Sequence, residues 1–180
     1  MNLILFGFKG SGKTHFGKLL SIEMHRPFID TDDLASELFT KETGKKRNAK
    51  QISEELGEPG FRALETRTLE LLQNVQNSII ALGGGAVLKP ENVELLQKIG
   101  QLVFLKAAPG KIKERMFKGD LPSFLDKKDP EGSFWKMIQE REPIYRSIPA
   151  RSVDTDVLDE PGVLAALKSI FLLEEPHLGL

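Results

Sequence analysis

The feature that most constrains this chain is an eight-residue stretch near its start, Gly7 to Thr14, with the sequence GFKGSGKT. It fits the pattern G-x-x-x-x-G-K-[ST]. A short apolar run at residues 2–6 precedes it, and apolar residues at helical spacing follow it over residues 13–24. A strand, a glycine loop and a helix in this order form the context in which the pattern binds phosphate. The chain is therefore predicted to bind a nucleoside triphosphate.

Each residue type in this loop has a physical reason. Glycines let the backbone curl so that its N–H groups point at phosphate oxygens, and the helix that follows adds its positive N-terminal dipole. Lys13 is predicted to neutralise the β- and γ-phosphates and to be catalytic, and Thr14 is predicted to place its hydroxyl on Mg²⁺. The predicted ATP-binding residues of the loop are Gly7, Gly10, Ser11, Gly12, Lys13 and Thr14.

Further apolar patterns alternate between strand and helix along the chain. Strands are predicted at residues 27–29, 78–82, 101–105 and 152–153, and helices at 34–40, 52–56, 60–77, 90–99, 109–117, 133–142 and 161–173. Such alternation is typical of a parallel sheet covered on both faces, with ligands beyond the carboxyl ends of the strands. The predicted fold is an α/β three-layer P-loop NTPase fold with a central parallel sheet of about five strands.

The length of 180 residues predicts a single domain, 1–180, because one hydrophobic core suffices for a chain of this size. The stretch Lys118 to Gly132 is rich in Lys, Asp, Gly and Pro, too polar for the core and longer than most connections. We expect it to form a mobile lid, at about 118–132. Residues 174–180 are expected to form a flexible tail.

Charge and cysteine content narrow the class of partner. Lys plus Arg number 25 and Asp plus Glu number 26, so no global field favours nucleic acid or an anionic membrane. The chain has no cysteine, which fits a reducing compartment, and its first residues do not form a signal peptide. No apolar run approaches the length of a bilayer span. A cytoplasmic protein with small-molecule partners, no nucleic acid and no membrane is expected.

Two carboxylates follow the second predicted strand, in the run Asp30-Thr31-Asp32. At this edge of the sheet, one carboxylate suits Mg²⁺ and the other suits the proton of an attacking hydroxyl. The alternative is that Asp32 or Asp33 caps the helix that follows.

Three further patterns suggest ligand contacts more weakly. Arg62 and Glu65 lie three residues apart in a helical pattern, which on its own favours a surface salt bridge. Arg141, close to Pro143, is interpreted first as a solvated arginine at a helix end. The run Gly83-Gly84-Gly85 after an apolar strand permits close backbone approach to a ligand.

In this order, the patterns resemble the shikimate kinase family over nearly the whole chain. The resemblance rests on Gly7 to Thr14, on DTD at 30–32, GEPGFRALE at 57–65, LGGGAV at 82–87, REPIY at 141–145 and VDT at 153–155. It implies transfer of the γ-phosphate of ATP to the 3-hydroxyl of shikimate, with Mg²⁺, in the pathway to chorismate and the aromatic amino acids.

The resemblance also implies roles for particular residues. Asp32 resembles the family residue that binds the shikimate hydroxyl and acts as the catalytic base. Asp30 resembles the family's acidic residue near Mg²⁺. Arg62 and Arg141 resemble the arginines that bind the substrate carboxylate, a role that suits the planar guanidinium. The remaining substrate-binding residues implied are Glu65, Gly84 and Gly85, and the remaining ATP-binding residues are Arg115, Val153 and Asp154.

One segment departs from the family pattern. The family's lid usually carries an Arg-Pro pair, whose arginine reaches the transferring phosphate, whereas this chain has Leu121-Pro122 at the matching place. Lysine at 118, 127 or 128 is a possible substitute, although a point charge lacks the guanidinium fork.

Alternative functions stay open at this stage. One is another small-molecule kinase on the same fold, of the gluconate or nucleotide type, and the second is a weakly active homologue that binds shikimate. A guanine-specific N-K-x-D sequence is absent, which argues against a GTPase. The expected state is a monomer.

Overall fold

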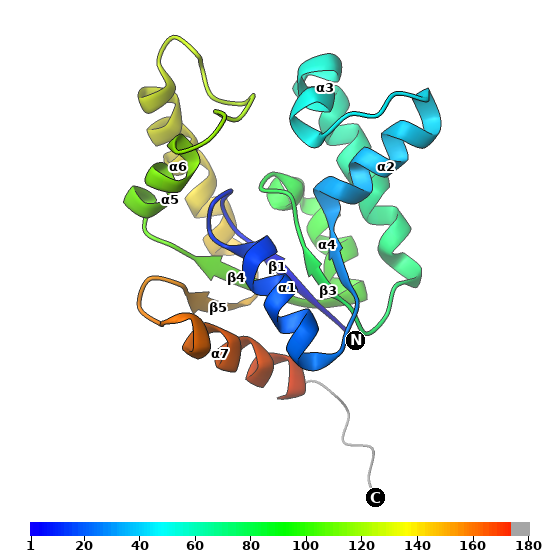
Figure 1. Ribbon diagram of the computed structural model, residues 1–180, viewed down its shortest axis with the longest axis vertical. Helices are drawn as coiled ribbons and strands as arrows, with labels where there is room; N and C mark the ends of the chain where they lie inside the picture. Colours follow the sequence, from blue (N-terminus) through cyan, green and yellow to red (C-terminus); the bar gives the residue numbers. More distant parts are fainter. Residues whose placement is uncertain (174–180) are drawn as a thin grey trace, which may run out of the picture.

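The computed structural model describes residues 1–173, and its centre is a five-stranded sheet in the order β2-β3-β1-β4-β5 (Figure 1). Every neighbouring pair of strands is parallel. The strands are β1 Asn2–Phe6, β2 Phe28–Asp30, β3 Ile79–Ala81, β4 Gly100–Lys106 and β5 Arg151–Asp154. The predicted tail at 174–180 lies outside the described residues.

Seven helices in the described part of the chain surround this sheet, with two short 3-10 turns. They are α1 Lys13–Met24, α2 Thr31–Thr43, α3 Ala49–Glu70, α4 Pro90–Ile99, α5 Pro109–Phe117, α6 Pro130–Ser147 and α7 Glu160–Leu173, and the turns are η1 Leu71–Asn74 and η2 Ala86–Leu88. The predicted three-layer P-loop NTPase fold is confirmed. Within residues 1–173, no helix combines the length and the apolarity that crossing a bilayer requires.

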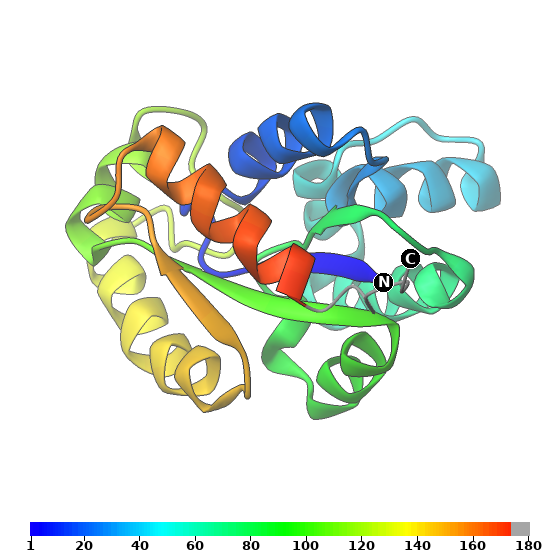
Figure 2. The same ribbon diagram turned by 90° about the horizontal axis from the view of Figure 1, so that it is seen from below.

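Strand β1 shows why the sheet is covered on both faces. All five of its residues are buried. Leu3 and Leu5 join the cluster packed under α1 and α7, whereas Ile4 and Phe6 join the larger cluster under α4 and α6 (Figure 2). Because successive side chains of a strand point to opposite faces, a continuous apolar run is what a two-faced sheet requires. Each such side chain contributes about 1.5–3 kcal/mol by its burial.

Helices α2 and α3 pack on each other through a third, smaller cluster beyond the edge of the sheet, formed by Ala35, Phe39, Ile52 and Leu64 (Figure 1). The sequence predicts two helices here, at 52–56 and 60–77. The structure has one element that starts at Ala49 and ends at Glu70, with a kink at Gly57, where φ is 69°. The start is earlier than predicted because Asn48 and Gln51 form a capping box.

The predicted lid is three residues too long. The irregular segment is 118–129, and α6 begins at Pro130, where Asp129 caps the helix by accepting from the N–H of Gly132. From here on, the lid means residues 118–129. It is also less polar in its packing than predicted, since Pro122 and Leu125 are buried.

Helix α6 is longer than the predicted 133–142, and it continues through Pro143 to Ser147. Proline lacks the N–H that would bond one turn back, but tertiary packing holds the helix together here. Arg141 is therefore in a helix interior rather than at a helix end, and the prediction of a solvated terminal arginine is wrong.

Candidate active site

A cavity of about 1030 Å³ opens beyond the carboxyl ends of the parallel strands. Its walls come from the phosphate loop, the starts of α1 and α2, α3 as far as Glu65, the turn after β3, the lid and α6, with one residue each from α5 and α7. In Figure 1, α2 and α3 lie on one side of this region, and α5, α6 and the lid lie on the other. This is the edge at which parallel α/β sheets place their ligands.

The phosphate loop adopts a backbone that only glycine takes without strain. The φ angles of Gly7, Gly10 and Gly12 are 146°, 87° and 97°. A side chain at these positions would strain the backbone, and Gly12 is also the N-cap of α1. The backbone conformation thus explains why the sequence pattern has glycine at these positions.

Lys13 is buried, and its ammonium donates to the carbonyls of Gly7, at 3.0 Å, and Phe8, at 2.9 Å. Burial lowers its pKa from 10.5 to about 8, although the carboxylates of Asp32 and Asp30 oppose the shift. The lysine lines the cavity and is held by the loop it belongs to. A nucleotide phosphate offers it the negative charge that these carbonyls only partly supply.

The structure separates the predicted loop residues into two groups. Gly10, Gly12, Lys13 and Thr14 line the cavity. Ser11 does not line it: its hydroxyl is buried and its N–H donates to the carbonyl of Phe8 at 3.1 Å. Gly7 contributes its carbonyl to Lys13 rather than a surface to the cavity.

Thr14 and Asp30 meet at the edge of the cavity. The Thr14 hydroxyl donates to Asp30 Oδ2 at 2.7 Å, and Asp30 Oδ1 accepts from the N–H of Asp32 at 3.0 Å. Asp30 is therefore the cap of α2, and the prediction that Asp32 or Asp33 is the cap is wrong. Two adjacent oxygen donors beside a phosphate loop fit Mg²⁺, which takes one or two protein oxygens in addition to phosphates and water.

Because Asp30 caps the helix, the carboxylate of Asp32 is left to the cavity. The protein around the cavity displaces water from this carboxylate and raises its pKa, and the charge of Asp30 raises it further, whereas Lys13 and Lys9 lower it. A carboxylate with a raised pKa accepts a proton more readily at neutral pH. Asp32 thus has the position and the chemistry of a general base.

Arg62 and Glu65 pair as their spacing predicts, with Nη1 donating to Oε2 at 2.8 Å. However, only 15% and 5% of their side-chain surfaces are exposed, so the prediction of a surface salt bridge is wrong. Burial raises the pKa of Glu65, and the Arg62 guanidinium opposes the shift. A Cβ at Gly85 would collide with the Arg62 guanidinium, so a larger residue there would push this group out of its observed place.

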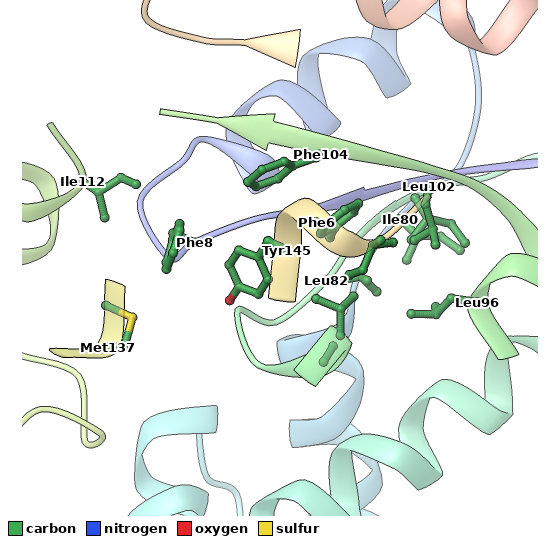
Figure 3. Close-up of a cluster of buried hydrophobic side chains, with 14 of the residues drawn as sticks. Phe6, Phe8, Ile80, Leu82, Leu96, Leu102, Phe104, Ile112, Met137 and Tyr145 are labelled. Carbon is green, nitrogen blue, oxygen red and sulfur yellow. The ribbon is translucent and has the colours of Figure 1, made fainter. Parts of the chain in front are cut away.

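Arg141 and Tyr145 lie one turn apart on α6. Arg141 lines the cavity, and the Tyr145 hydroxyl donates to the carbonyl of Gly84. The Tyr145 ring packs 4.6 Å from the ring of Phe8, and its oxygen is turned away from Phe6 and Phe104 (Figure 3). Tyr145 thus ties the glycine turn to the helix that carries Arg141. No sequence pattern predicted this role, because the four-residue spacing indicates only that Tyr145 and Arg141 share a face of α6.

Comparison with known proteins agrees with this geometry. The family model for shikimate kinase matches residues 9–170. The chain belongs to the shikimate kinase family. A shikimate kinase from Caldicellulosiruptor bescii is 36% identical over 174 residues, 97% of each chain. A structure of shikimate kinase from Acinetobacter baumannii in complex with shikimate has a TM-score of 0.79 and 28% identity, covering 96% of this chain and 91% of that one.

The predicted function is thereby confirmed: the chain is a kinase of the shikimate kinase family. A gluconokinase from Sinorhizobium meliloti has a TM-score of 0.55 over 96% of this chain and 94% of its own, but its identity of 16% reflects a shared fold alone. The gluconate-type alternative therefore receives no support beyond the fold.

On the nucleotide side, the residues that the family motifs imply lie at different places relative to the cavity. Arg115 lines the cavity, and its Nη1 donates to the carbonyl of Gly10 at 2.9 Å. Val153 is buried in the core, and the Asp154 carboxylate accepts from the N–H groups of residues 156 and 157, so neither residue lines the cavity. His15 and Glu160 line it instead. They are joined at 2.6 Å, and no sequence motif indicated them.

At the lid position where the family usually has an arginine, this chain has Leu121, and the structure shows where its side chain lies. Leu121 is half-buried and packs against the large core cluster rather than lining the cavity. None of the three lysines considered as substitutes lines the cavity either, among them Lys118, which pairs with Glu114. In the described chain, two lysines besides Lys13 line it: Lys9 in the phosphate loop and Lys50 on α3.

Proposed function

We propose that the chain transfers the γ-phosphate of ATP to the 3-hydroxyl of shikimate, giving shikimate 3-phosphate and ADP. The observation that carries the proposal is that one cavity joins the phosphate loop to Asp32 and to two arginines, Arg62 and Arg141. Guanidinium groups bind a carboxylate through paired, charge-assisted hydrogen bonds. In a chain with a net charge of −1, a small acid needs such local charge to bind.

The proposed reaction assigns one task to each group. Asp32 accepts the proton of the acceptor hydroxyl as its oxygen attacks the γ-phosphate, and Lys13 neutralises charge on the phosphates. Thr14 and Asp30 would hold Mg²⁺, which would supply positive charge to the phosphates during transfer. Arg62 and Arg141 hold the acceptor carboxylate, and Glu65 orients Arg62. Gly84 and Gly85 offer backbone groups to the acceptor.

The lid also has a task in this proposal. Closed over the cavity, it excludes water that would otherwise take the γ-phosphate. In the described structure the lid reaches α3 through the hydroxyls of Ser123 and Ser53, 3.1 Å apart, and through Lys50 and Asp120, 3.6 Å apart. These contacts support a lid that closes against the α3 side.

The test is the release of ADP from MgATP with and without shikimate. Strong dependence on shikimate is expected, and Lys13→Ala should remove it, because the phosphates lose their cation. The variant also serves to subtract contaminating kinases. The proposal is rejected if the wild type releases no more ADP than Lys13→Ala does, whatever acid is added.

A single domain, a monomer and a cytoplasmic location complete the proposal and stay predictions. Size-exclusion chromatography with light scattering tests the monomer against the chain mass of 20.1 kDa.

A further inference from the structure

The lid presents an aromatic ring to the cavity. Phe124 lines the cavity, and the Arg141 guanidinium lies over its ring, with Cζ 5.0 Å from the ring centroid. This distance is within the range of about 6 Å at which a cation is attracted to an aromatic face. Phe124 is the one lid residue of the described chain with a ring contact to a cavity arginine.

The turn that carries Phe124 is fixed on both sides. Pro122 and Leu125 are buried, and the Leu125 N–H donates to the carbonyl of Pro122 at 3.1 Å. Between them, Ser123 donates to the hydroxyl of Ser53 on α3. The ring itself stays 37% exposed, so burial in the core does not account for its position. The lid is thus built to hold this ring at the cavity wall.

The chemistry of the pair explains what the ring does. A guanidinium over an aromatic face keeps its N–H groups, which lie in its own plane, available for hydrogen bonds. The ring also displaces water from one side of the guanidinium, which strengthens its attraction to a carboxylate. A long arginine side chain loses less rotational freedom on binding when one rotamer is already favoured.

We propose that Phe124 is a positioning residue, which holds the Arg141 guanidinium in place for the carboxylate of the acceptor and so makes acceptor affinity depend on lid closure. The inference rests on the proposed function, because it takes the acceptor to be a small carboxylic acid. Phe124 touches Arg141 and acts through it.

The test compares Phe124→Leu, Phe124→Tyr and Trp135→Leu. Leucine keeps the apolar surface but removes the ring face, and tyrosine keeps the face. Trp135 is a matched control, because it is an aromatic residue of similar exposure, 39%, whose ring also meets a cation, Lys113, but it does not line the cavity. The readouts are KM for shikimate, KM for ATP, kcat and, by calorimetry, the Kd for shikimate.

For Phe124→Leu we expect KM and Kd for shikimate to rise by about 3- to 30-fold, the range that a cation–π contact accounts for, with kcat and KM for ATP close to the wild type. Phe124→Tyr should keep both constants close to the wild-type values, and Trp135→Leu should leave them unchanged. Combining Phe124→Leu with Arg141→Met should add little to the effect of Arg141→Met alone, because each change removes the same cation–π contact.

Three outcomes would overturn the inference. The first is an unchanged KM for shikimate in Phe124→Leu, while the wild type turns shikimate over. The second is a fall in kcat alone, or an equal rise in both KM values, which would show that the ring serves lid closure in general. The third is a wild type that neither binds nor phosphorylates shikimate. That result rejects the proposed function, and the inference with it, whereas the first two reject the inference alone.

Discussion

The two halves of the cavity are built in different ways. The half for the phosphate donor is mainly one continuous segment, Gly7 to Thr14, and its backbone angles and the contacts of Lys13 are local. The half for the acceptor is assembled from α2, α3, the turn after β3, the lid and α6. Its key contacts, such as that between Tyr145 and Gly84, join residues far apart in the sequence. Phosphate binding therefore depends on local conformation, and acceptor binding on how the elements pack.

Asp32 lies where the two halves meet, and its substitution should have the largest effect. We expect Asp32→Asn to lower kcat by about 10²- to 10⁴-fold, because the attacking hydroxyl loses its proton acceptor. Steady-state kinetics with both substrates measures this, and a thermal melt checks that the fold is kept. Asp33→Asn is the matched control, because Asp33 is adjacent but does not line the cavity. A kcat near the wild-type value in Asp32→Asn would show that Asp32 is not the catalytic base.

The acceptor half alone should respond to Gly85→Ala. Gly85 has φ −99° and ψ −6°, so alanine fits the backbone, but its methyl would displace the Arg62 guanidinium. A charge-assisted contact of about 1.5–3 kcal/mol is then weakened, which predicts a rise in KM for shikimate of about 10- to 100-fold.

The comparison requires that KM for ATP stay unchanged in Gly85→Ala. Gly110→Ala is the control, because nothing lies within 4 Å of a Cβ built there. Equal changes in both KM values would mean that the two halves are not separable at this turn.

The smallest effect should come from a side chain of the donor half, Lys9, and it should appear in the pH profile of kcat/KM. The positive charge of Lys9 lowers the pKa of both Asp32 and Lys13. The proposed reaction needs Asp32 deprotonated, so activity should rise with pH through a value above 3.8. It needs Lys13 protonated, so activity should fall above about pH 8. In Lys9→Met both groups hold their protons more tightly, and both limbs of the profile should move to higher pH.

Lys18→Met is the control for this measurement, because Lys18 is exposed on α1 and does not line the cavity. Limbs that stay in place in Lys9→Met, or that move in opposite directions, would contradict the charge effect.

The difference between the two halves of the cavity also explains how much of the fold and of the site could be predicted from the sequence. The glycine pattern of the phosphate loop predicted its own conformation, since positive φ angles at Gly7, Gly10 and Gly12 are a local property. The parallel sheet followed from apolar runs such as residues 2–6, whose burial on both faces is also visible in the sequence.

The acceptor half was predictable only through family motifs, and its packing was not. Spacing alone indicated that Arg62 and Glu65 pair, but not that they are buried, because burial depends on the glycine turn that packs against them. The choice of Asp30 as the cap of α2 could not be predicted either, because three acidic residues within four positions, Asp30, Asp32 and Asp33, offer the same chemistry to the helix end.

The kink at Gly57 has a mechanical consequence. It divides α3 into a first part with the lid partners Lys50 and Ser53, and a second part with Arg62 and Glu65. Without helical dihedral angles at Gly57, the two parts do not form one stiff rod. A displacement of the first part at its lid contacts therefore need not be passed rigidly to the buried Arg62–Glu65 pair in the second part.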